Sequence, residues 1–81
     1  MTKEEFHAKL ESLRTFDFEF NGTTYLISLE KKTDSSGKEI QRIYFGEQYL
    51  PPQEYENFAH LMADCEIGFR YLREVIKSLD L

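Results

Sequence analysis

The chain of 81 residues has one cysteine, Cys65, and no run of more than three consecutive apolar residues. A single cysteine excludes an intramolecular disulfide, on which small secreted domains usually depend, so we expect a reducing cytoplasmic location. A secretory signal needs about 7–15 consecutive apolar residues and a membrane-spanning helix needs about 20, so we expect neither. The sequence therefore predicts an unprocessed cytosolic chain that has no membrane partner.

Basic residues are also scarce. Lys and Arg number 10 against 15 Asp and Glu, which gives a formal net charge of −5. Non-specific nucleic-acid binding depends on cations that neutralise phosphates, so this balance argues against it. Hydrophobic residues make up 41% of the chain and aromatic residues 15%, enough for one compact core. We expect a single domain over residues 1–81, because the chain is too short for two.

The N-terminus carries the signature of a helix start. Thr2 and Glu5 have the spacing of a capping box, in which each side chain bonds to the other residue's backbone amide. The apolar residues behind them recur at helical spacing and predict a short amphipathic helix over residues 3–14. The residues of this stripe are Phe6, Leu10 and Leu13.

An aromatic hairpin is expected next. Residues 16–20 alternate strictly, Asn21-Gly22 tolerates the positive φ angles of a type I′ turn, and residues 23–30 resume a strand pattern. The expected register pairs Phe20 with Thr23, Phe18 with Tyr25 and Phe16 with Ile27. This register gives one apolar and one polar face, with Leu26 as the apolar exception on the polar face.

The remainder predicts a third strand and two helices. A polar loop over 31–38 leads to a strand over 39–45 that Gly46 ends, and 48–52 is an extended connection because proline cannot donate to a sheet ladder. Helical spacing then predicts one helix from Pro52 to about Cys65, and a second helix that reaches the C-terminus. Their apolar stripes are Tyr55, Phe58, Leu61 and Met62, and then Phe69, Leu72, Val75, Ile76 and Leu79.

The expected fold class is therefore α+β. We predict a three-stranded antiparallel β-meander with helices packed on one face, in the order α-β-β-β-α-α. After the aromatic hairpin, the order Phe58…Leu61-Met62…Ile67-Gly68…Leu72…Glu74-Val75 resembles small uncharacterised bacterial proteins built as a helix, a meander and two C-terminal helices. The resemblance implies a fold and carries no catalytic or binding residue to this chain.

Residues able to support catalysis or metal binding are few. His60 and Asp64 are four apart and Cys65 follows, but a zinc site needs three or four converging ligands, and paired spacing such as C-x₂-C is absent. We expect His60 and Asp64 to form an exposed i, i+4 pair, and Cys65 to act as a small, partly buried hydrophobe. No glycine-rich phosphate-binding motif is present. The sequence thus predicts no enzyme activity, no metal and no cofactor.

Acidic residues are concentrated in one part of the chain. Between Arg42 and Arg70 there is no Lys or Arg, and five residues are acidic: Glu47, Glu54, Glu56, Asp64 and Glu66. Such a segment either steers a basic partner or is a solvated surface that keeps a small protein in solution. Tyr49 within it either presents its ring at an interface or tucks with Leu50 under the helix as a lid on the core.

We therefore expect a non-catalytic protein–protein interaction module with a basic partner. The expected contact residues are Glu47, Tyr49, Glu54 and Glu56. An alternative is an acidic inhibitor or immunity-type protein that binds and blocks a basic enzyme. A remote alternative is nucleic-acid association through Arg70, Arg73 and Lys77 on one face of the last helix. Self-association through the uncovered sheet face or the edge of the third strand is also open.

Overall fold

The computed structural model describes residues 1–79. Helix α1 (Lys3–Leu13) leads into one antiparallel sheet whose strands lie side by side in chain order: β1 (Thr15–Phe20), β2 (Thr23–Thr33), β3 (Glu39–Glu47) and β4 (Gln53–Tyr55). The remaining elements are α2 (Phe58–Asp64), the hairpin of β5 (Glu66–Ile67) and β6 (Arg70–Tyr71), α3 (Leu72–Val75) and the 3₁₀ turn η1 (Ile76–Ser78). The expected α+β class with an antiparallel sheet is confirmed.

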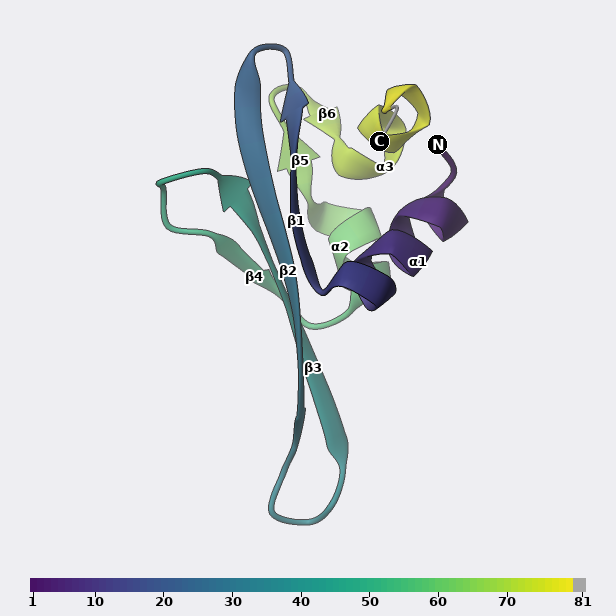
Figure 1. The fold of residues 1–81 in the computed structure, drawn as a ribbon, viewed down its shortest axis with the longest axis vertical. Helices are drawn as coiled ribbons and strands as arrows, with labels where there is room; N and C mark the ends of the chain where they lie inside the picture. The colour runs from purple at the N-terminus through teal and green to yellow at the C-terminus, as the bar shows by residue number, and fades with distance from the viewer. Residues whose placement is uncertain (80–81) are drawn as a thin grey trace.

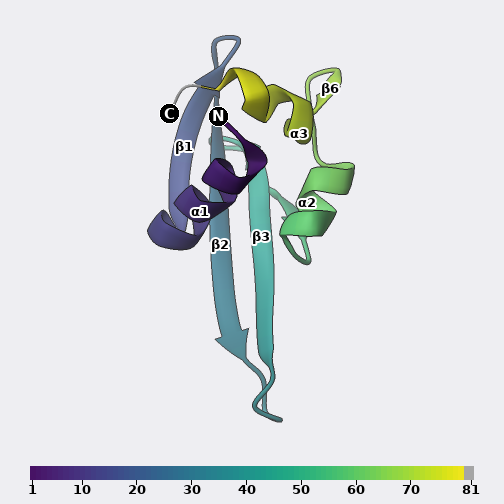
Figure 2. The same cartoon turned by 90° about the vertical axis from the view of Figure 1, so that its right-hand side faces the viewer.

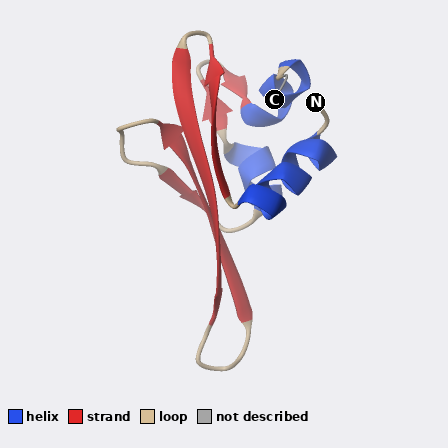
Figure 3. Cartoon of the chain, viewed as in Figure 1, coloured by secondary structure: helices blue, strands red, loops and turns tan. Residues whose placement is uncertain are grey.

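All three helices lie on one side of the sheet, and the loop between β3 and β4 extends on the other side (Figures 1 and 3). The core fills the space between the sheet and the helices. Its buried members are Phe6, Leu10, Phe16, Phe18, Ile27, Leu29, Ile43, Phe45, Leu61, Met62, Cys65, Ile67, Leu72, Val75, Ile76 and Leu79. Within residues 1–79, no helix combines the length and the hydropathy needed to cross a bilayer.

The helix start and the hairpin follow the sequence prediction. Thr2 Oγ1 accepts from the Glu5 amide at 3.1 Å, and Glu5 Oε1 accepts from the Thr2 amide at 3.0 Å. The hairpin register is as expected, and Leu26 lies on the outer face. Leu13 was expected in the apolar stripe of this helix, but it is 53% exposed. The helix ends at Leu13, and the chain reverses at Arg14 with φ of 67°.

The sheet has four strands rather than the three expected. Gln53–Tyr55 pairs with β3, so Tyr55 reaches the core from a strand and not from a helix. The helix begins only at Phe58, because Asn57 is its N-cap and accepts from the His60 amide at 2.8 Å. The expected helix start at Pro52 is therefore wrong.

The C-terminal helix is also shorter than expected. Residues 66–71 form the β5–β6 hairpin, which turns at Gly68 with φ of 66° and leaves the side chain of Phe69 fully exposed. Phe69 was predicted to be part of an apolar helix stripe, and this prediction is wrong. Residues 80 and 81, to which that expected helix extended, lie outside the described residues.

Strand β2 continues to Thr33, into the segment expected to be a loop, whereas β3 begins at Glu39 as expected. They extend beyond the helices as a two-stranded arm (Figure 2). At its tip Asp34 Oδ1 accepts from the amides of Ser36 and Lys38, both at 2.9 Å.

Gly46 lies within β3 and does not end the strand, contrary to the sequence prediction. A Cβ at this position would lie 3.1 Å from Cα of Pro52. Glycine at this position thus permits the close approach of the β3–β4 connection.

Candidate functional site

The sheet face that the helices leave uncovered carries a cluster of exposed apolar side chains. Tyr49 is 94% exposed and Leu50 is 56% exposed in the β3–β4 loop, and Leu26 is 40% exposed on β2. With Tyr44 of β3, these side chains line one small hollow of about 90 Å³. We call these four residues the outer patch.

A tight turn positions Tyr49. The Leu50 amide donates to the Glu47 carbonyl at 3.1 Å, and the Gln48 amide donates to the Thr24 carbonyl at 2.9 Å, which ties the turn to β2. Tyr49 itself has φ of 71°, a conformation that disfavours residues with a Cβ. The interpretation of Tyr49 and Leu50 as a lid on the core is therefore wrong, because the turn holds both side chains in solvent.

The four expected contact residues do not form one acidic surface. Glu47 and Tyr49 line the same hollow, but Glu47 is the register partner of Tyr25, whose side chain packs against the core. Burial raises the pKa of Tyr25, and the Glu47 carboxylate adds to this shift. Glu54 is paired with Arg42 at 2.9 Å. Glu56 lies past the end of β4, where its amide donates to Nδ1 of His60 at 3.4 Å.

Two further carboxylates on the outer face come from β1. Asp17 is the register partner of Leu26, and Glu19 is the partner of Thr24, so both lie on the outer face. The alternation of residues 16–20 already assigned Asp17 and Glu19 to the polar face. Their position across β2 from β3, which carries Tyr44, depends on β2 lying between β1 and β3, and no local pattern specifies this order.

The candidate catalytic and metal-binding residues lie in and around α2. His60 Nε2 and Asp64 Oδ2 are 2.6 Å apart, which confirms the expected exposed pair. Cys65 is fully buried, and burial raises the pKa of its thiol to about 11, with a smaller contribution from Glu66 in the same direction. The residues from 1 to 79 contain no cluster of three or more side chains suited to hold a metal ion.

The basic residues near the C-terminus do not share a helix face. Arg70 is in β6, Arg73 is in α3 and Lys77 is in η1. Arg73 is also engaged, because its Nη1 donates to the carbonyl oxygens of Met62 and Ala63 at 3.1 Å each. The single helix face on which the nucleic-acid alternative was based is therefore not formed.

The fold and the site together define an α+β domain with a sheet covered on one face only and an apolar patch on the other. Comparison with protein-family models, curated proteins and solved structures finds no match for this chain. Function is therefore inferred from the chemistry of the surface.

Proposed function

We propose that this chain is a non-catalytic binding module that recognises a basic protein through the outer patch. The observation that carries the proposal is the placement of Tyr49. Its ring is almost completely exposed, and its backbone is held at a positive φ that costs roughly 1–2 kcal/mol for a residue with a Cβ. Strained backbone persists where the surrounding structure imposes it, and it concentrates at functional sites.

The neighbours of Tyr49 fit a protein interface. Leu26, Tyr44 and Leu50 add apolar area around a ring whose hydroxyl stays in water. Tyrosine is enriched among the residues that dominate binding energy, since it provides a large area at low cost in conformational entropy. The outer patch thus has an anchor surrounded by apolar contacts.

The charges around the outer patch favour a basic partner. Asp17, Glu19 and Glu47 are carboxylates at its margins, and among the described residues none of them makes an ion pair. Arg42, the nearest cation on the outer face, is paired with Glu54. Complementary charge speeds association and opposes wrong partners.

The test begins with affinity capture from the lysate of the source cell, followed by titration of the purified captured protein. Tyr49→Asn is the test variant, because asparagine tolerates positive φ and removes only the ring. Phe69→Asn is the matched control, since it removes an equally exposed ring at the β5–β6 turn. We expect Tyr49→Asn to weaken binding at least about tenfold and Phe69→Asn to leave it unchanged.

Three results would contradict the proposal. Equal binding by wild type and Tyr49→Asn would place the contact elsewhere. An association rate that does not fall with added salt would show that the partner is not attracted by its basic charge. A dimer of the chain that Tyr49→Asn dissociates would make the outer patch a self-association surface. If the captured protein is a basic enzyme that this chain inhibits, the inhibitor form of the proposal is supported.

A further inference from the structure

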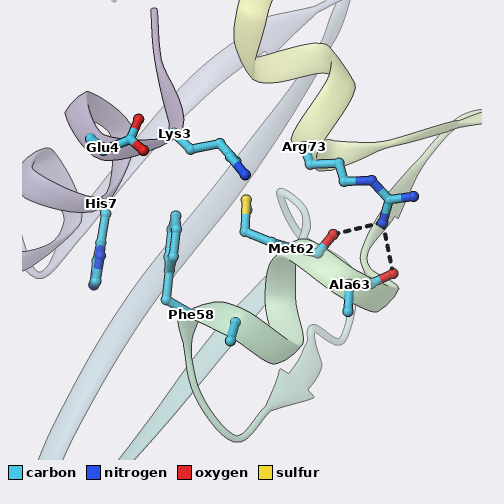
Figure 4. A pocket seen from close by; sticks show the side chains of 8 residues that line it. Lys3, Glu4, His7, Phe58, Met62, Ala63 and Arg73 are labelled. Carbon is cyan, nitrogen blue, oxygen red and sulfur yellow. Dashed lines mark hydrogen bonds between the residues drawn. The ribbon is translucent and has the colours of Figure 1, made fainter.

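A second hollow lies among the helices, on the opposite side of the sheet from the outer patch. It has a volume of about 530 Å³ and is formed where α1, α2 and α3 meet (Figure 4). This volume lies within the range of small-molecule sites, about 300–1,000 Å³. The side chains that line it are Lys3, Glu4, His7, Phe58, Ala59, Met62, Ala63 and Arg73. We call this hollow the helical cleft.

The apolar part of the helical cleft is built around a flat ring. Phe58 stacks on His7 with 4.0 Å between ring centroids and 3° between the ring planes. His7 is held in turn by Glu11, whose Oε1 is 3.5 Å from Nε2. Glu11 is fixed by Lys31 at 2.7 Å. The stacked rings of Phe58 and His7 are therefore held in place before any ligand binds. Met62 beside them offers a polarizable surface that favours aromatic contacts.

The polar part of the helical cleft carries an excess of positive charge. Figure 4 shows the Lys3 side chain reaching toward Met62 from α1, and within residues 1–79 its ammonium makes no ion pair. Arg73 is fixed by the α2 carbonyls and by the Tyr71 ring, 4.1 Å from its guanidinium carbon. Glu4 is the one carboxylate of the lining. The charges thus complement a ligand with a single negative group.

We infer that the helical cleft binds a small aromatic carboxylate. The aromatic body of the ligand lies against Phe58 and Met62, and its carboxylate accepts from the Lys3 ammonium. Arg73 contributes positive potential from the wall of the cleft, where the α2 carbonyls hold its guanidinium through Nη1. This site is separate from the outer patch, so it stands or fails independently of the proposed protein partner.

The test is a titration of the full chain with naphthoate. Calorimetry measures the affinity, and amide chemical shifts locate the binding site. Naphthylmethanol is the neutral comparison, because it keeps the ring system and loses the charge. We expect naphthoate to bind more tightly than the alcohol and to shift amides of α1 and α2 selectively. Lys3→Met removes the anion contact and should weaken naphthoate binding about fivefold, while Lys38→Met at the tip of the β2–β3 arm should have no effect.

A second pair of variants tests the location. Ala59→Phe places a ring inside the helical cleft from an exposed helix position and should abolish binding. Ala8→Phe adds the same ring at an exposed position of α1 outside the cleft, and should bind like wild type. Equal affinity for naphthoate and the alcohol, unchanged binding by Ala59→Phe, or no shifts at millimolar naphthoate would overturn the inference.

Discussion

Nε of Arg42 lies 2.9 Å from Oε1 of Glu54, so an ion pair joins β3 to the edge strand β4. Both side chains are substantially exposed, and the pair lies on the outer face next to Tyr44. It neutralises one carboxylate of the acidic segment. It also withholds a cation from the surface around the outer patch.

Loss of the Arg42–Glu54 ion pair should change the free energy of unfolding little and the rate of association with a basic partner more. We expect Glu54→Gln to lower the free energy of unfolding by less than about 1 kcal/mol, as for other exposed pairs. The same change releases Arg42 beside the outer patch and should slow association with a basic partner. Urea unfolding and stopped-flow association measure the two effects. A coupling energy well above 1 kcal/mol in the Arg42/Glu54 double-mutant cycle would contradict the assignment of a solvated pair.

Stability and binding measurements test two separate properties of Tyr49, its backbone conformation and its ring. Because its φ is 71°, glycine fits the turn better than alanine does, and Tyr49→Gly should be more stable than Tyr49→Ala by about 1 kcal/mol. Both variants lose the ring, so both should lose affinity for the partner. Urea unfolding gives the stability order, and titration gives the affinity.

Tyr44 provides the control for that comparison. It lies within β3 in extended backbone, so Tyr44→Gly should be less stable than Tyr44→Ala. If alanine is preferred at both positions, the positive φ at Tyr49 is not a feature of the folded chain in solution.

Arg73 should stabilise the packing of α3 against α2. Its Nη1 bonds to two carbonyls in the last turn of α2, where a cation is favourable. Arg73→Gln should therefore lower the free energy of unfolding by about 1–3 kcal/mol. Arg70→Gln in the exposed β6 strand should change it by less than about 0.5 kcal/mol. Equal losses in urea unfolding would show that general charge, not the α2 carbonyls, accounts for the effect.

Local patterns predicted the parts of the fold that depend on local chemistry. The β1–β2 hairpin follows from Asn21-Gly22 between two alternating segments, and both turn residues have the positive φ that its turn requires. Strand β4 has no such signal. It is three residues long, between Pro52 and Asn57, and within residues 1–79 β3 is the strand with which it pairs. A strand this short satisfies strand and helix spacing equally well, so its state is decided by tertiary pairing.

In the candidate site too, the sequence predicts what depends on neighbouring residues and misses what depends on tertiary structure. The sequence makes Tyr49 an expected contact residue but leaves open whether its ring is exposed or covers the core, and neither its turn nor its positive φ is evident from residue type. Asp17 was correctly assigned to the polar face, yet its place beside Leu26 and near Tyr44 needs the strand order as well as the hairpin register. Charge density along the chain was a poor guide, since Glu54 and Asp64 are each engaged by a neighbour.

Cys65 gives the chain a defined loss of stability at alkaline pH. Burial raises the pKa of the thiol from an ordinary value of 9.0 to about 11 in the folded chain. Between these values the unfolded chain loses the thiol proton while the folded chain keeps it, so the free energy of unfolding falls as pH rises. The contribution is fully present below about pH 9 and, at 1.4 kcal/mol per pKa unit, its loss is on the order of 2 kcal/mol by pH 11.

Urea unfolding at a series of pH values, compared with Cys65→Ala, isolates this effect. The variant should lose less stability than wild type between pH 9 and about pH 11, although Tyr55, whose pKa burial also raises, still contributes in both proteins. Iodoacetamide should modify the folded wild type slowly at neutral pH and rapidly after unfolding, because the thiol is both protonated and enclosed. Parallel pH profiles for the two proteins, or rapid alkylation of the folded chain, would mean that the thiol is accessible to solvent and that its pKa is near the ordinary value.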